Sequence, residues 1–357
     1  MRANEARSLR ATFGWGVGLA SFMLLAGCSS PGGVCEDRSA PGCTACEAAP
    51  GQPQRLFGLT WNFAEGDAGS GLGTEELRCI VPGTGATDLV VGIPGMDWLP
   101  VGNNAYDREG STLYALAFAN SDNITRIFSI QTVTGELLGN PAIEGELSWS
   151  GGIHVRSDGA LVGVAWNLDE TREEVRIIDP ATGATSLIAA VPEIDSLQTA
   201  TYAYDSVEDV IYMIGMAKGD AATRLFAIDA EDGALLGDPA FVDAPNWSGG
   251  IHVRKDGQLV GVGWEWTDPD HTAGVEKLFT IDATTAKVAP IAAIPGLLTI
   301  LLGGHVYDDI ADTVYIVDGD HRLFEIDATS GETLAKPKLG TPKPGQEYNW
   351  SGGLHVR

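Results

Sequence analysis

Short apolar runs alternate with turn-forming residues from position 54 to the end of the sequence. The segment from Leu161 to Trp166 is one such run, and Gly, Asp or Asn lies within a few residues of its ends. Runs of this length that are rich in Val, Ile and aromatic residues are typical of β-strands. The sequence also contains 46 Gly and 18 Pro, too many breakers for a helical bundle. The pattern therefore predicts an all-β fold.

One eight-residue segment occurs three times. Trp149-Ser-Gly-Gly-Ile-His-Val-Arg156 returns at 247–254 and, with Leu in place of Ile, at 350–357. The spacings of 98 residues (149 to 247) and 103 residues (247 to 350) are too long for one supersecondary unit. Each period is therefore expected to contain two units.

Two kinds of unit do alternate along the chain. The first kind covers residues 149–193 and 247–296, and the second kind covers 103–142, 200–240 and 303–337. Each unit contains four β-rich runs separated by Gly, Asp or Asn turns. Four strands in about 50 residues are the size of one propeller blade.

The ends of the repeat region complement each other. The last copy, 350–357, supplies a first strand alone, whereas residues 54–94 supply the other three strands of the same kind of unit. Leu56–Trp61 aligns with Leu161–Trp166 without a gap. We therefore expect a six-bladed β-propeller over residues 54–357, with three pairs of alternating blade types. Its C-terminal strand should close the N-terminal blade.

The blades resemble the YVTN, NHL and quinoprotein-type propellers, through strands that approximate Leu-Tyr-x-Ile-Asp-x-x-Thr-Gly. Residues 323–331, Leu-Phe-Glu-Ile-Asp-Ala-Thr-Ser-Gly, are one example. The resemblance implies the fold and indicates no ligand.

The N-terminal residues have the pattern of an export signal. Three Arg and one Glu in residues 1–10 precede an apolar run that ends in Leu25-Ala26-Gly27-Cys28. This ending resembles the lipobox of bacterial lipoproteins. The resemblance implies that residues 1–27 are a signal peptide, that Cys28 is lipidated, and that residues 28–53 form a tether. Ser29 after the cysteine implies an outer-membrane lipoprotein that faces the periplasm or the cell surface.

Four further cysteines lie after the lipobox: Cys35, Cys43, Cys46 and Cys79. An exported protein enters an oxidising compartment, so we expect disulfides, with Cys79 bridged to one of the three tether cysteines. The Cys43-Thr-Ala-Cys46 spacing also occurs in metal and redox motifs, but no second such pair and no βαβ pattern accompanies it.

Repeated charged residues mark the ends of the predicted first strands. The first strand of one kind of unit ends in Arg156, Arg254 or Arg357, and the first strand of the other kind ends in Asp107, Asp205 or Asp308. Because the blades alternate, these six residues are expected to form an Arg/Asp ring of ion pairs between blades. His154, His252 and His355 lie two residues before the arginines. Structural hydrogen bonding is the favoured role of these histidines, and a threefold metal site is the alternative.

Six of the nine tryptophans fall at the opposite ends of these strands. They are Trp61, Trp149, Trp166, Trp247, Trp264 and Trp350. One interpretation is core packing between blades. The other is a rim of aromatic platforms that binds sugars or peptides next to long polar loops.

Charge and motifs restrict the function. The net charge of −26, without clustered Lys or Arg, argues against nucleic acid. The sequence has no P-loop, HExxH or GxSxG motif. We expect a lipid-anchored, cell-envelope binding protein with no catalytic role, cofactor or metal, and with a protein or an envelope glycan as partner. The alternative is a propeller hydrolase or lyase acting on sugars, lactones or peptides. Such an enzyme should place unrepeated Asp, Glu, Asn or His in an axial pocket, whereas a binding module should present a repeated aromatic rim.

Overall fold

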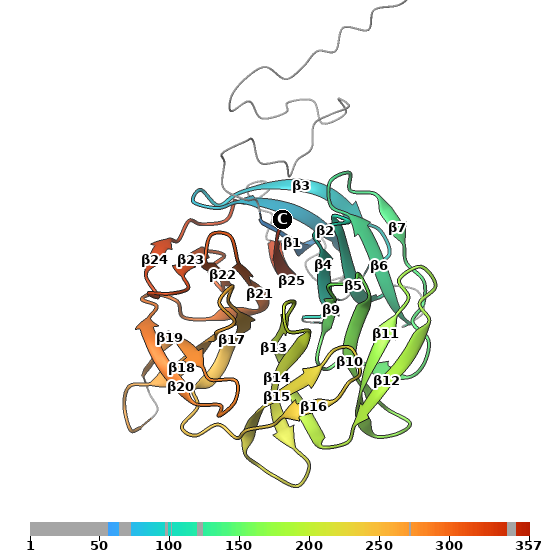
Figure 1. The fold of residues 1–357 in the computed structure, drawn as a ribbon. Coiled ribbons are helices and arrows are strands. Elements are labelled where there is room, and N and C mark those ends of the chain that lie inside the picture. The colour runs from blue at the N-terminus through green and yellow to red at the C-terminus, as the bar shows by residue number, and fades with distance from the viewer. Residues whose placement is uncertain are drawn as a thin grey trace, which may run out of the picture. The chain divides into compact units, whose positions relative to one another are not determined.

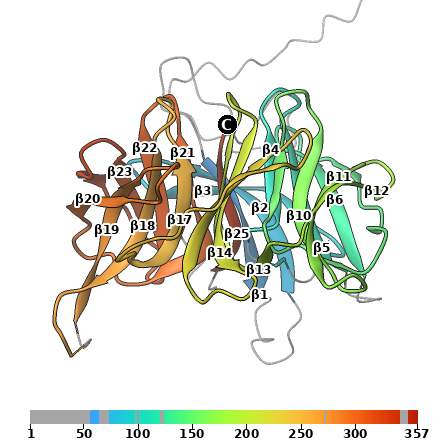
Figure 2. The ribbon, with the colours of Figure 1, turned by 60° about the horizontal axis from the view of Figure 1, so that its bottom comes forward.

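The computed structural model describes residues 56–63, 73–96, 99–100, 102–119, 124–270, 273–340 and 348–357. These residues form six small antiparallel sheets arranged around a central axis as a six-bladed β-propeller (Figure 1). The strands of each blade run between the two faces of the ring (Figure 2). No helix among the described residues is long and apolar enough to span a membrane.

The blades are of two alternating kinds, as the repeats predict. We call blades 1, 3 and 5 the tryptophan blades. Their strands, from the axis outward, are β25 (Tyr348–Val356), β1 (Leu56–Phe63), β2 (Gly73–Val81) and β3 (Ala86–Ile93) in blade 1; β8 (Leu147–Ser148) with β9 (Ile153–Val155), β10 (Leu161–Asn167), β11 (Arg172–Ile178) and β12 (Thr185–Val191) in blade 3; and β17 (Asn246–Val253), β18 (Leu259–Trp266), β19 (Gly274–Ile281) and β20 (Val288–Ala293) in blade 5.

We call blades 2, 4 and 6 the tyrosine blades, because the strand nearest the axis ends in Tyr-Asp in each. Their strands are β4 (Asn104–Asp107), β5 (Thr112–Phe118), β6 (Thr125–Gln131) and β7 (Leu137–Gly139) in blade 2; β13 (Ile194–Asp205), β14 (Val210–Ala217), β15 (Thr223–Asp229) and β16 (Leu235–Gly237) in blade 4; and β21 (Ile300–Asp308), β22 (Thr313–Asp318), β23 (Leu323–Asp327) and β24 (Thr333–Ala335) in blade 6.

The predicted closure is confirmed. Strand β25 pairs antiparallel with β1, with Val356 opposite Leu56 and His355 opposite Phe57. Strand β25 therefore supplies the axial strand of the first blade, and β1 is paired on both sides, with β25 and with β2.

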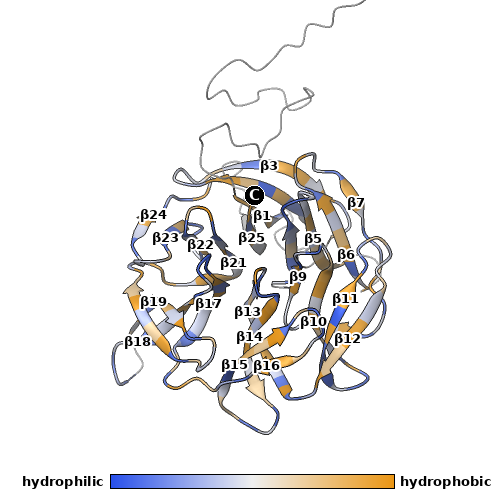
Figure 3. Cartoon of the chain, viewed as in Figure 1, coloured by the Kyte–Doolittle hydropathy of each residue, from blue (hydrophilic) through white to orange (hydrophobic). Residues whose placement is uncertain are grey.

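The core consists of hydrophobic clusters between consecutive blades. Among the described residues there are six, one for each neighbouring pair of blades. Phe128, Phe226 and Phe324, at equivalent positions in the tyrosine blades, are fully buried in three of them. Figure 3 shows the matching hydropathy, with apolar residues concentrated on the strands and polar residues on the turns. The ring therefore gains stability at every blade interface.

Three of the repeated tryptophans belong to this core, as one of the two interpretations of the sequence predicts. Trp149, Trp247 and Trp350 are only 7%, 5% and 5% exposed, and each lies in the cluster that joins its blade to the preceding tyrosine blade. A Cβ atom on Gly163 or Gly261, on the neighbouring strand, would lie 2.7 Å from Cζ3 of the indole. The glycine makes room for the ring, so these three indoles cannot act as platforms for a ligand.

Candidate functional site

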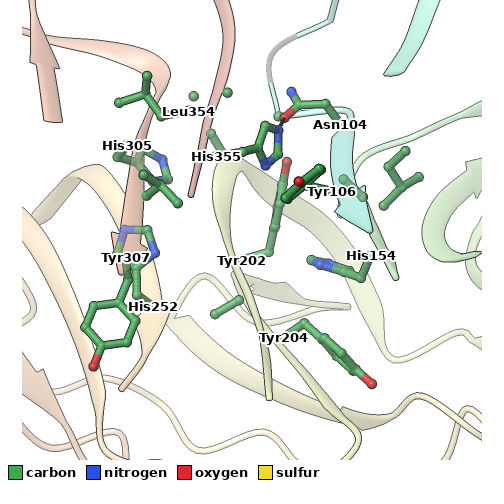
Figure 4. A pocket seen from close by; sticks show the side chains of 18 of the residues that line it. Asn104, Tyr106, His154, Tyr202, Tyr204, His252, His305, Tyr307, Leu354 and His355 are labelled. Carbon is green, nitrogen blue, oxygen red and sulfur yellow. Dashed lines mark hydrogen bonds between the residues drawn. The ribbon is translucent and has the colours of Figure 1, made fainter. Parts of the chain in front are cut away.

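The strands nearest the axis enclose a cavity of about 310 Å³ (Figure 4). Its lining comes from all six of these strands: β4, β9, β13, β17, β21 and β25. The volume is at the lower end of the range for small-molecule sites, about 300–1,000 Å³. The cavity therefore has room for a small organic molecule.

Each tryptophan blade contributes one histidine to the wall, and each histidine meets a different residue of the next tyrosine blade. The ring centroids of His154 and Tyr202 are 5.2 Å apart in an edge-on arrangement. Those of His252 and His305 are 5.0 Å apart. His355 has its Nε2 atom 2.6 Å from Oδ1 of Asn104. The three equivalent histidines thus have three chemically different partners.

The double glycine of the repeated segment explains how these partners fit. Gly152 and Gly250 have φ values of +73°, which favour glycine. A side chain on Gly152 would collide with the ring of Tyr202, and one on Gly250 would collide with His305. Gly353, the third equivalent, faces Asn104 in the same way. We call these three places the glycine sockets.

Burial keeps the axial histidines neutral. It lowers the pKa of His154 to about 4, that of His305 to about 4 and that of His355 to about 3. Burial is also the largest cause of the lowered pKa of His252, and the neighbouring His305 adds to it. At neutral pH this part of the wall therefore carries imidazoles without charge. Among the described residues, no group of three or more His, Cys, Asp or Glu could hold a metal ion.

One tyrosine from each tyrosine blade, Tyr106, Tyr204 or Tyr307, also lines the cavity, and two of the three have a hydrogen-bonded hydroxyl. The Tyr204 hydroxyl donates to Oδ1 of Asp209 at 2.5 Å, and the Tyr307 hydroxyl donates to Oδ1 of Asp312 at 2.8 Å. Figure 4 shows both hydroxyls directed away from the cavity. Tyr106, the third equivalent, has a buried hydroxyl with no partner among the described residues.

Several other buried polar atoms of the wall also have no hydrogen-bond partner among the described residues. They include Nε2 of His154, Nε2 of His252 and Nδ2 of Asn104. Figure 4 shows the His154 imidazole directed from β9 toward the cavity. An unsatisfied buried polar group costs about 1–3 kcal/mol, so these atoms are suited to a partner that the protein does not itself supply.

Acidic side chains are absent from the part of the wall that the structure describes. The described lining residues include no Asp, Glu, Ser, Thr or Cys. Its one charged residue, Arg108, has its Nη1 atom 2.8 Å from Oδ1 of Asp309, and both side chains are nearly half exposed. The pocket thus has the unrepeated Asn and His expected of an enzyme, but not the carboxylates.

The predicted Arg/Asp ring has different acids from those we expected. Arg156 pairs with Asp209 at 3.3 Å, and Arg254 pairs with Asp312 at 3.2 Å, in each case across a blade boundary. The expected partners Asp107, Asp205 and Asp308 instead accept hydrogen bonds from backbone amides of their own turns. The prediction that Asp205 and Asp308 pair with Arg156 and Arg254 was wrong, because the turn satisfies each aspartate locally. The remaining arginine, Arg357, follows β25.

The other three repeated tryptophans, which we call the outer tryptophans, differ from the three in the core. Trp61, Trp166 and Trp264 are half-buried near the ends of β1, β10 and β18. Trp264 meets Trp266 edge-on, with centroids 5.8 Å apart, and Trp266 is 44% exposed. The described structure therefore leaves only this outer set available as a rim.

The sequence-based reasoning missed Asn104, Tyr202 and His305. A signal was present, because these residues occupy one position of a faithful repeat and differ in every copy. The histidines were recognised, but their asymmetric partners were not.

The predicted signal peptide, the lipidated Cys28 and the tether cysteines Cys35, Cys43 and Cys46 lie outside the described residues. Cys79 lies on β2 and is buried. Its bridge to the tether stays a prediction.

No protein-family model and no curated protein matches the sequence. Solved structures match in fold. A chain of a nidogen/laminin complex has a TM-score of 0.53 at 12% identity, covering 84% of this chain and 98% of its own. Hydrazine synthase from Kuenenia stuttgartiensis has a TM-score of 0.50 at 14% identity, covering 71% and 70%. A periplasmic gluconolactonase from Pseudomonas aeruginosa has a TM-score of 0.47 at 12% identity, covering 82% and 99%. At these identities the likeness concerns the propeller fold alone.

Proposed function

We propose that this protein is a lipid-anchored envelope protein that binds one small uncharged ligand in its axial cavity and does not transform it. The observation that carries the proposal is the set of buried, unpartnered polar atoms in the cavity wall, Nε2 of His154 and His252 and Nδ2 of Asn104. A ligand with hydrogen-bonding groups would satisfy them.

The charge of the wall supports an uncharged ligand. The axial histidines are neutral, and Arg108 already has Asp309 as a counterion. A charged ligand would lose its hydration without gaining an opposite charge, which is costly.

The chemistry of the wall supports binding rather than hydrolysis. Hydrolases of sugars and peptides use paired carboxylates or a nucleophile with an adjacent base, and the described lining residues include neither arrangement. A histidine with a pKa of about 4 is also a weak general base at neutral pH, where the optimum lies near the working pH.

A binding screen tests this function. The full chain in detergent is titrated with uncharged compounds, namely monosaccharides, cyclic polyols, nucleosides and aromatic alcohols, and melting temperature and heat of binding are recorded. Binding should weaken at least tenfold in His252→Leu and persist in Leu236→Ala, a change on the outer strand β16. Binding that ignores His252→Leu would overturn the axial site. Turnover of a bound lactone or glycoside, lost in His252→Leu, would replace binding by hydrolysis.

The anchor is a proposal of its own, which rests on the lipobox. Cys28→Ala should abolish labelling by fatty acid and release the protein from the membrane fraction. Persistent labelling would contradict the anchor. The protein would then not be attached to the membrane through a lipid on Cys28, and this result would not affect the proposed ligand site.

A further inference from the structure

Blade 2 differs from the two other tyrosine blades at three positions, two of which, Asn104 and Arg108, line the cavity. Asn104 stands where the other copies have Tyr202 and His305. Arg108 stands where they have Ser206 and Asp309, and Ser111 stands where they have Asp209 and Asp312. Asn104, Tyr106 and Arg108 of this blade all line the cavity.

The first departure changes a glycine socket. Tyr202 and His305 fill their sockets with rings, whereas Asn104 has a shorter side chain and is only 8% exposed. Its Oδ1 atom is occupied by His355 at 2.6 Å, and its Nδ2 atom has no partner among the described residues. A Cβ atom on Gly353 would collide with Oδ1 of Asn104, so this socket is as closely filled as the others, but it presents an unused hydrogen-bond donor.

The difference at Ser111 leaves a tyrosine hydroxyl without a hydrogen-bond partner. In blades 4 and 6 the tyrosine hydroxyl donates to Asp209 or Asp312. In blade 2 the equivalent residue is Ser111, and the buried hydroxyl of Tyr106 has no partner among the described residues. Blade 2 thus has an unpartnered amide nitrogen and an unpartnered tyrosine hydroxyl. In blade 6 the equivalent of Asn104, His305, also has unpartnered ring nitrogens, but the hydroxyl of Tyr307 is bonded to Asp312. Among the described residues only blade 2 therefore has an unpartnered group at both positions.

We infer that blade 2 is the recognition wall of a single site for an uncharged, hydroxylated ring, a monosaccharide-sized sugar or a cyclic polyol. The inference rests on the proposed function and specifies its ligand. A hydroxyl group both donates and accepts, so it can pair with the Asn104 amide, with the Tyr106 hydroxyl and with either tautomer of His154 or His252. The tyrosine and histidine rings of the wall suit the C–H faces of such a molecule.

The asymmetry also fixes the stoichiometry. Three equal sockets would give three equal sites, but Asn104, Tyr202 and His305 differ, and only one of them is an asparagine. We therefore expect one ligand per chain, in place of the three equivalent sites that a repeated rim would provide.

The test is calorimetry on the full chain with glucose, galactose, mannose and myo-inositol as probes, and with glucuronate and glucosamine as charged counterparts. At least one neutral probe should bind at 1:1, more tightly than its charged counterparts. Asn104→Leu removes the donor at nearly constant size, and Asn104→Tyr replaces the amide with the tyrosine that stands at this position in blade 4. Both should weaken binding at least tenfold. Asn140→Leu, the same change elsewhere in blade 2, should leave binding unchanged, and the melting temperature of each variant verifies folding.

Three results would overturn the inference in distinguishable ways. Binding of uncharged non-hydroxylated aromatics such as phenol or indole, with no sugar or polyol bound, would refute the ligand class and leave the axial site standing. Sugar binding at 3:1, or unaffected by both Asn104 variants, would refute blade 2 as the recognition wall. Absence of binding by every neutral probe and every compound of the wider screen would refute both this inference and the proposed function.

Discussion

In the tryptophan blades the strand nearest the axis carries the same repeated segment in all three copies, apart from Leu354 in place of Ile. In the tyrosine blades one axis-facing position holds Asn, Tyr or His. The constant strands supply the core indoles, the glycine sockets and the histidines. The variable strands supply what fills the sockets. The repeated segment packs in the same way in each tryptophan blade, but the residue that it meets in the next blade is Asn104, Tyr202 or His305. This difference among the copies indicates an asymmetric site.

The largest expected effect on stability comes from removing one of the repeated axial strands of the tryptophan blades. Deleting residues 350–357 removes the axial strand of blade 1, the indole of Trp350 and a histidine of the wall. The exposed edge of β1 and the opened cluster should make the protein insoluble or non-cooperative in unfolding. Denaturation followed by tryptophan fluorescence and circular dichroism measures this. A soluble variant with an unchanged transition would contradict the closure.

A single indole should have the next largest effect. Trp247→Ala leaves a cavity over Gly261 in the cluster between blades 4 and 5, so it should cost about 3–5 kcal/mol in the free energy of unfolding. Trp266→Ala, on the exposed end of β18, should cost less than about 1 kcal/mol. Urea denaturation of both variants provides the comparison, and equal losses would show that Trp247 is not a core residue.

Acid should act on two buried groups with opposite signs. The pKa of His154 is lowered to about 4 by burial, so this histidine contributes stability above its unfolded value of 6.5, and that stability is lost as the pH falls toward 4. Burial raises the pKa of Glu173 to about 7, although Ser150 opposes the shift through a 2.6 Å hydrogen bond. The contribution of Glu173 to stability is therefore present below pH 4.5, the pKa of a glutamate in the unfolded chain, and is lost as the pH rises to about 7.

Two variants separate these contributions in urea denaturation between pH 4 and pH 7. His154→Gln should lose less stability on acidification than the parent protein, because it cannot be protonated in the unfolded state. Glu173→Gln should lose more, because it lacks the gain that the glutamate provides as the pH falls. Parallel curves for all three proteins would contradict both assignments.

The smallest effect tests the difference between blade 2 and its copies. Tyr307→Phe removes a hydroxyl bonded to Asp312, so it should cost about 1 kcal/mol. Tyr106→Phe removes an unpartnered hydroxyl and should leave the ligand-free protein equally stable or slightly more stable. A cost for Tyr106→Phe equal to that for Tyr307→Phe would show that this hydroxyl has a partner after all.

The sequence predicted the fold well because the repeat itself records the blade count and the closure. It predicted contacts less well. For Trp149, Trp247 and Trp350 it left core packing and a binding rim both open, because the glycine that makes room for each indole lies on another strand. Asp205 appeared to face Arg156, but its own turn amides satisfy it and Asp209 takes the arginine. Which side chains meet across a blade boundary depends on register and twist, which spacing along the chain does not specify.

The axial site shows the same limit. His154, His252 and His355 were visible as a repeated pattern, but the pairing of each with a different residue of the next blade required the ring to be assembled. Asn104 drew no attention in the sequence because a lone asparagine before a Tyr-Asp turn is an ordinary strand residue.

The most direct test of the axial site is the ¹⁵N resonance of the histidine side chains during titration with myo-inositol, or with whichever neutral probe binds in calorimetry. The Nε2 atoms of His154 and His252 have no hydrogen-bond partner among the described residues, whereas His321 lies outside the wall, in blade 6. Saturation should shift the Nε2 resonances of His154 and His252 and leave His321 unchanged. Saturation with both axial resonances unmoved would place the ligand elsewhere and contradict the account.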